Sequence, residues 1–269
     1  MTDSEPSRVF FAEESDPEMQ RAYARARETF RYCWREIAWE KRRVVPGLDF
    51  AYVKAAFSDG EEARNRSGTP TVEHMWLSDV DFDGRFVTGV LLNEPTWLRT
   101  ARKGDAARVA PDLLSDWMYK LGPDVFGAYT VNLLRSRMSA AERRAHDGAW
   151  GLDFGDPAKI RVVPGPTGPG GRLKGWFARP DQEPGEHPMS VAMAPSLQAQ
   201  LAKDPSLVRK RDERGWTFLH EEALAGSAAT VKVLLEAGAD RSALTNDGMT
   251  AGQLARSLGW TRVIDLLGV

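Results

Sequence analysis

The chain has 269 residues, of which 42% are hydrophobic and 28% charged, so it can bury a sizeable core in one large or two ordinary domains. Its 36 basic and 38 acidic residues give a formal net charge of -2, which provides no basic field for a phosphate backbone and argues against nucleic acid as a partner. Cys33 is the single cysteine, which excludes an intramolecular disulfide and a cysteine-built zinc or iron–sulfur site and fits a reducing cytoplasm.

The first residues of the chain are acidic and lack the cationic start and the apolar run of a signal peptide. No later stretch approaches about 18 consecutive apolar residues, the length that a membrane-spanning helix needs. We therefore expect a cytoplasmic protein without a membrane partner.

A long amphipathic helix is predicted over residues 16–42. Ser15 and Glu18 have the spacing of a capping box, Pro17 is tolerated in the first turn, and a Pro-Gly pair after residue 45 bounds the other end. Apolar residues recur at spacings of three and four, which places them on one stripe of the helix. The stripe consists of Met19, Ala22, Tyr23, Ala26, Phe30, Cys33, Trp34 and Ile37.

Short β-branched and aromatic runs follow this helix. They predict antiparallel strands over residues 48–57, 72–80 and 85–92. Asp83 and Gly84 stand between the last two runs and are typical of a hairpin turn.

A further apolar stretch covers residues 108–119, and a second helix is predicted over residues 139–150. Ser139 and Glu142 form a capping box at the start of that helix. The N-terminal part of the chain is therefore expected to be a mixed α+β domain with strands in its middle.

The strand region carries a specific set of motifs. They are EHMW at 73–76, F-x-x-G-x-L-x-N-x-P from Phe86 to Pro95, Gly104-Asp105, SDWMY at 115–119 and AHDGAWGLDFGDP at 145–157. By these motifs, residues about 48–160 resemble the bacterial domain of unknown function DUF2314. The resemblance implies a small, strongly bent sheet and, since no activity is established for that family, no defined chemistry. Members of the family are often joined to ankyrin repeats, and the family is similar to a neighbouring one counted among the immunity proteins of bacterial toxin systems.

Residues 163–190 are rich in proline and glycine, which predicts a linker or a surface loop. An internal repeat with an offset of 33 residues follows. Its paired anchors are Gly215-Trp216-Thr217 with Gly248-Met249-Thr250, Gly226 with Gly259, and, at an offset of 32, Leu234-Leu235 with Leu266-Leu267.

The repeated segments resemble the ankyrin repeat. Residues 212–248 look like one nearly complete unit, residues 250–267 like a closing unit, and residues 193–208 like the second helix of a degenerate leading unit. In each unit a threonine can cap the first helix, and Thr217 and Thr250 stand at these positions. His220 can tie the turn of the nearly complete unit. The departures from the family pattern are Phe218 in place of proline, and Glu221 and Glu222 in place of apolar or small residues.

We therefore expect an α+β domain, built from a long helix and a strongly bent antiparallel sheet, over residues 1–162. A linker or loop is expected over 163–190, and a short all-α ankyrin-repeat stack over 191–269. Because each repeat buries its apolar face only against a neighbour, and about three repeats are needed for independent stability, the stack is predicted to dock onto the N-terminal domain.

Candidate chemistry is confined to a few histidines and carboxylates. A carboxylate adjoins His74, His146 and His187 in sequence, and a metal-assisted hydrolase would need His74, His146 and Asp147 to converge with Asp153 or Asp156. The competing interpretation is that these histidines are structural, because adjacent strand residues point to opposite faces.

Two metal motifs are incomplete. Asp79, Asp81 and Asp83 open a calcium loop, but its twelfth position is Val90, so an acidic hairpin turn is the preferred interpretation. His220 and its glutamate neighbour lack the second histidine of a zinc-protease helix. The sequence predicts no cofactor.

The hypothesis that follows is a non-enzymatic protein-binding protein, with a role like that of an immunity protein, whose partner contacts the ankyrin face or the α+β domain. Aromatic residues are the favoured anchors of such contacts. The candidate contact residues are His74, Trp76, Asp116, Trp117 and Trp216. The alternatives are the metal-assisted hydrolase and a stability module of a larger complex.

Overall fold

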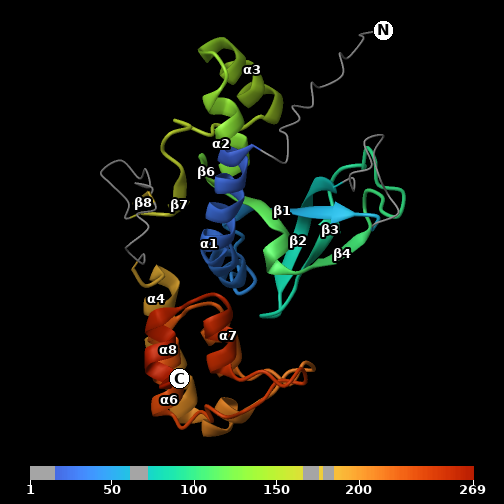
Figure 1. Ribbon diagram of the computed structural model, residues 1–269. Coiled ribbons are helices and arrows are strands. Elements are labelled where there is room, and N and C mark those ends of the chain that lie inside the picture. The colour runs from blue at the N-terminus through green and yellow to red at the C-terminus, as the bar shows by residue number, and fades with distance from the viewer. Residues whose placement is uncertain (1–15, 61–71, 166–175, 178–184) are drawn as a thin grey trace.

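The computed structural model describes residues 16–60, 72–165, 176–177 and 185–269 (Figure 1). Helix α1 (Pro17–Glu40) lies near the middle of the molecule, between the short helices at one end and the C-terminal helices at the other. The predicted helix is confirmed, but its cap is Asp16, whose carboxylate accepts hydrogen bonds from the amides of Glu18 at 2.9 Å and Met19 at 3.4 Å. The capping box proposed for Ser15 falls on a residue outside the described part.

A six-stranded antiparallel sheet packs against α1, and its strand order is β4-β3-β2-β1-β5-β6. The expected hairpin is confirmed as β2–β3, where the Asp83 side chain accepts from the amides of Arg85 and Phe86. Register shifts interrupt the β1–β5 and β2–β3 ladders. The strands are β1 (Leu48–Ser58), β2 (Val72–Phe82), β3 (Val87–Leu91), β4 (Ala106–Val109), β5 (Leu114–Leu121) and β6 (Asp124–Gly127).

Two short helices follow β6 and extend away from the sheet (Figure 1). Helix α3 (Ala140–Trp150) begins at the predicted capping box, in which the Glu142 amide donates to the Ser139 hydroxyl at 3.3 Å and the Ser139 amide to the Glu142 carboxylate at 2.8 Å. Helix α2 (Tyr129–Ser136) and strand β6 were not predicted. Beyond α3, β7 (Arg161–Val163) pairs with β8 (Trp176–Phe177), and most of the expected linker lies outside the described residues.

Residues 188–269 form helices joined by tight turns. Two helix pairs repeat the same pattern, and their connecting turns bond to each other. The Asn246 side-chain amide donates to the Glu213 carbonyl at 2.9 Å, and the Arg211 guanidinium to the Leu244 carbonyl at 2.5 Å, each across 33 residues. The helices are α4 (Pro188–Lys203), α5 (Phe218–Leu224), α6 (Ala228–Glu236), α7 (Ala251–Ser257) and α8 (Thr261–Leu267).

The C-terminal helices pack against the second half of α1. The Tyr32 ring lies edge-on to the Trp260 ring, with ring centres 5.9 Å apart, and the Arg42 guanidinium is 2.5 Å from the Glu222 carboxylate. One hydrophobic cluster runs from the sheet through α1 into these helices. None of the described helices is long and apolar enough to cross a membrane.

Candidate interaction sites

The side of β1 and β2 that carries Lys54 presents half-buried aromatic rings. Lys54 is the register partner of Trp76, and Phe50 and Tyr52 share its side of β1 because strand residues alternate. The Phe50 and Tyr52 rings stack with centres 4.5 Å apart, and the Lys54 ammonium lies 5.5 Å from the centre of the Trp76 ring. We call Phe50, Tyr52, Lys54 and Trp76 the aromatic face.

The aromatic face lies beside the smaller of the two hydrophobic clusters, on which its three rings pack. That cluster contains Met118 and Phe154, whereas α1 packs on the opposite side of the sheet, where Trp117 donates from its indole to the Ala26 carbonyl at 3.0 Å. Partly exposed Phe, Tyr and Trp on a sheet surface are the residue types that protein interfaces favour.

His74 lies at the end of β2 nearest Tyr23. The two rings stack with centres 4.9 Å apart, and the His74 Nδ1 is buried without a hydrogen-bond partner among the described residues. Burial, and to a smaller extent the positive charge of Lys54, lower the pKa of His74 to about 4. His74 is therefore neutral at neutral pH, and its ring is packed on Tyr23 of α1.

The other three predicted contact residues lie in the interior. Asp116, Trp117 and Trp216 are 0%, 1% and 5% exposed. The Asp116 carboxylate accepts hydrogen bonds from the amides of Trp117, Tyr129 and Thr130 at 2.8 to 2.9 Å, and burial raises its pKa. These buried side chains stabilise the packing of β5 and of the C-terminal helices, and a partner protein cannot reach them.

The proposed metal residues are not brought together. His146 is 3.0 Å from Asp147, but Arg135 already holds the Asp147 carboxylate with two hydrogen bonds of 2.8 and 2.7 Å. Asp153 and Asp156 accept backbone amides within their own turns, and His74 stacks on α1. Within the described ranges, no group of three or more histidine, cysteine or acidic side chains could hold a metal ion.

The acidic hairpin region also has structural partners. Asp81 is 2.6 Å from the Lys41 ammonium, and Asp83 caps the β2–β3 turn. Asp79 adopts a left-handed backbone conformation with φ 50° at the irregular part of the β2–β3 ladder. These contacts fit the interpretation of an acidic hairpin turn.

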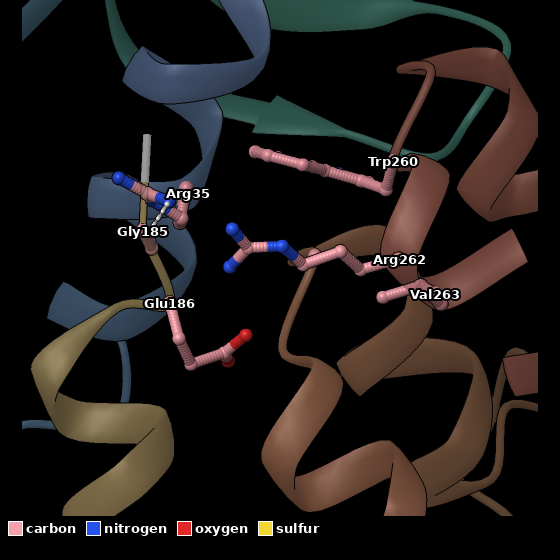
Figure 2. A pocket seen from close by; sticks show the side chains of 7 residues that line it. Arg35, Gly185, Glu186, Trp260, Arg262 and Val263 are labelled. Carbon is pink, nitrogen blue, oxygen red and sulfur yellow. Dashed lines mark hydrogen bonds between the residues drawn. The ribbon is translucent and has the colours of Figure 1, made fainter. Parts of the chain in front are cut away.

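A second feature lies between α1 and the C-terminal helices (Figure 2). It is a narrow pocket with room for about one water molecule, which we call the junction pocket. The Arg262 side chain extends from α8 into the pocket, whereas the Arg35 guanidinium of α1 turns toward the Gly185 carbonyl, and Glu186 and Trp260 also line the pocket. The full lining is Arg35, Gly185, Glu186, Gly226, Trp260, Arg262 and Val263.

The sequence patterns predicted only part of the aromatic face and nothing of the junction pocket. Trp76 was found because tryptophan is the strongest interface residue, but its neighbours Phe50, Tyr52 and Lys54 depend on the strand register. The junction pocket joins residues from the two ends of the chain, and no local signal connects them.

The fold and these surfaces define a two-part protein, in which an α+β sheet domain with a long helix carries a set of C-terminal helices. The family model described as an uncharacterized protein conserved in bacteria, DUF2314, matches residues 16–154. A Neisseria meningitidis serogroup B protein whose name assigns it ankyrin repeats is 39% identical over 260 residues, which cover 96% of each chain. The chain belongs to the DUF2314 family, as its motifs predicted.

Two further relatives match shorter parts of the chain. The uncharacterized protein YegJ of Escherichia coli K12 is 34% identical over 62 residues, which are 23% of this chain and 40% of YegJ. The human NAD-capped RNA hydrolase NUDT12 is 37% identical over 67 residues, which are 25% of this chain and 14% of that enzyme. A match to so small a part of NUDT12 brings none of its activity to this chain.

Proposed function

We propose that this protein is a non-enzymatic protein-binding protein whose partner contacts the aromatic face. The observation that carries the proposal is the group of three half-buried rings, Phe50, Tyr52 and Trp76, with Lys54 over the last of them. Rings held in this way bury a large area on binding at a small cost in side-chain entropy.

The C-terminal helices, in this proposal, are an ankyrin-type stack over residues 191–269 that braces α1. The support is the 33-residue repeat, the turn-to-turn hydrogen bonds and the name of the Neisseria relative. Contacts from α1 and the β2–β3 hairpin occupy part of α5 and α7, where Arg42 meets Glu222 and Gly84 touches Leu254. The stack then serves mainly as a support, and the α+β domain of residues 1–162 carries the binding surface.

A protein toxin met in the bacterial cytoplasm is the partner class that we favour. The support is membership of a family described as conserved in bacteria, together with the resemblance of that family to a neighbouring one counted among immunity proteins. The hydrolase alternative gives the aromatic face no role.

The test is affinity capture of a partner from bacterial lysate with immobilised full-length protein, followed by measurement of the purified pair. Because anchor tryptophans typically contribute about 2 kcal/mol or more to an interface, Trp76→Ala should weaken the partner's affinity about thirtyfold. Leu244→Ala is the control, since Leu244 is an exposed apolar residue in the turn between α6 and α7 and not in the α+β domain.

The control variant should bind like the wild type. A partner that binds Trp76→Ala and Tyr52→Ala with unchanged affinity would place the interface elsewhere and contradict the proposal. Far-ultraviolet circular dichroism melts of each variant separate a loss of binding from a loss of folding.

A further inference from the structure

A groove opens where β1 and β2 separate. The two strands are in register only from Val53 and Leu77 onward, so the earlier residues of β1 have register partners on β5 alone. The β2–β3 ladder is irregular at the same end, between Ser78 and Asp81. The opening has a volume of about 530 Å³ and is closed on one side by the end of α1. We call it the β1–β2 groove, and its volume is ample for a long side chain.

The lining of the β1–β2 groove is apolar along much of its length. Ile37 of α1 and Val80 of β2 are buried, and Leu48, Phe50 and Ala51 of β1 are partly exposed. Phe50 also belongs to the aromatic face, so the groove continues that surface toward the start of β1.

An exposed apolar pair stands beside the groove. Val44 and Val45 are 99% and 77% exposed. They lie in the turn that connects Lys41, directly after α1, with Leu48 at the start of β1, and both of these residues line the groove. Contiguous exposed apolar side chains next to a groove are typical of a surface that a protein partner covers. The two valines, the groove and the aromatic face therefore form one continuous surface.

The groove also contains a carboxylate that lacks a counter-ion. Among its charged residues, Lys41 is 2.6 Å from Asp81, and Glu40 is 2.7 Å from Arg43. Asp79 is exposed and has no cation at ion-pair distance in the part of the chain that the structure describes. Its carboxylate accepts only from the hydroxyl of the preceding serine, at 3.1 Å. A ligand for this groove should therefore be partly apolar and carry one positive charge.

An arginine side chain has the properties that this groove selects. Its aliphatic stem packs on apolar surface while its charged end stays near water. Its planar guanidinium donates paired hydrogen bonds to a carboxylate and also stacks on aromatic rings, which the ammonium of lysine does less well. Leu48 and Val80 provide the apolar surface, Phe50 the ring and Asp79 the carboxylate.

We propose that the β1–β2 groove binds an arginine side chain of the partner protein, whose guanidinium pairs with Asp79 and packs on the Phe50 ring. This inference rests on the proposed function, because it names the chemistry of the partner residue that lies next to the aromatic face. The partner surface then has an arginine beside the apolar residues that cover Val44 and Val45.

The test is an NMR titration of the methyl-labelled full chain with N-acetyl-arginine methylamide, which needs no partner. Ionic strength is held constant so that general screening does not change. The methyl signals of Ile37, Leu48 and Val80 should shift to saturation, with a dissociation constant on the order of 1–10 mM for so small a probe. N-acetyl-norleucine methylamide has an apolar stem without the charge, and it should bind about fivefold more weakly or less. N-acetyl-lysine methylamide should also bind more weakly than the arginine probe.

Matched variants locate the charge contact. Asp79→Asn should weaken binding of the arginine probe about fivefold and leave the norleucine probe unaffected. Asparagine tolerates the left-handed backbone of this position, with φ 50°, so the variant keeps the fold. Asp112→Asn is the control with the same change in net charge. Asp112 is an exposed carboxylate before β5, toward the other end of β1, where Ala55 pairs with Leu114.

The proposal is overturned if the three methyl signals do not shift, or if the norleucine or lysine probe binds as tightly as the arginine probe. It is also overturned if Asp112→Asn weakens binding as much as Asp79→Asn. Failure of the proposed function is a separate result, because it is measured as unchanged affinity of the captured partner for Trp76→Ala and does not affect the arginine titration.

Discussion

His74 and Asp116 show how the sheet changes the properties of single residues. His74 loses its ordinary readiness to take up a proton, because burial and the nearby Lys54 charge both lower its pKa. Asp116 has three backbone amides as donors and lies wholly inside. In a sequence, histidine and aspartate suggest a catalytic or metal-binding role. In this structure, packing explains His74 and backbone hydrogen bonds explain Asp116.

The first prediction concerns the effect of pH on stability through His74. Its pKa in the folded protein is about 4 against an ordinary value of 6.5, so the unfolded chain binds the proton more readily between these values. The resulting stability is complete above pH 6.5 and is lost as the pH falls toward 4. The shift corresponds to at most about 3 kcal/mol.

Urea unfolding of the wild type and of His74→Gln at pH 7.5 and pH 4.5 measures this effect. The variant should lose less stability on acidification than the wild type, by up to about 3 kcal/mol. Titration of the His74 ring signals by NMR provides a direct check. A midpoint near 6.5 would show that the ring is accessible to protons and that the explanation is wrong.

The helix pairs α5–α6 and α7–α8 begin with capping boxes that are built from different residues. Thr217 and His220 cap α5, and His220 Nε2 also lies 2.9 Å from the Ala243 carbonyl in the following turn. Thr250 and Gln253 cap α7, but Gln253 is exposed and makes no such connection in the described part. His220 therefore connects α5 to the turn that contains Ala243, and the repeat pattern predicted that His220 ties the turn.

The second prediction compares these two residues. His220→Ala should lower the free energy of unfolding by about 3 kcal/mol, because it leaves a buried amide and a buried carbonyl without partners. Gln253→Ala, the matched control, should cost about 1 kcal/mol or less as the loss of part of a cap. Urea melts followed by circular dichroism measure both. Equal losses would contradict the tying role of His220.

The whole molecule depends on α1, which is packed by the sheet on one side and by the C-terminal helices at its second half. Arg31 donates to the Gly259 carbonyl at 2.8 Å, and Arg42 forms a partly buried ion pair with Glu222, which also accepts from the Thr230 hydroxyl at 2.6 Å. Gly84 at the β2–β3 turn lies so close to Leu254 that an added Cβ would overlap it. The two parts therefore share one hydrophobic interior.

The third prediction is that residues 188–269 do not fold cooperatively when separated from the rest. The fragment would expose the Trp260 and Leu254 side chains, which are buried in the intact chain, and it has too few repeats to compensate. Thermal melts of the fragment and of the full chain, followed by circular dichroism, test this.

The full chain should show a single transition and the fragment none. A fragment that melts cooperatively near the temperature of the intact protein would show that α1 is not needed as a support. Glu222→Ala in the full chain is a milder check, and it should lower stability without removing the single transition.

The sequence by itself determined the parts that depend on near neighbours. The stripe of α1, the Asp83-Gly84 hairpin and the Ser139 capping box follow from local periodicity and hydrogen bonding, and so does the 33-residue repeat. The cap of α1 was misplaced by one residue because adjacent serine and aspartate can both cap a helix, and α2 lacked a strong start signal.

Only the tertiary structure decided which side chains form surfaces. Trp117 and Trp216 are core residues while Trp76 is half-buried, although all three are the same residue type. The reason is that burial depends on strand register and on packing between distant segments, which local patterns do not encode. The same reason explains why Arg35 and Arg262, at opposite ends of the chain, came together only in the folded molecule.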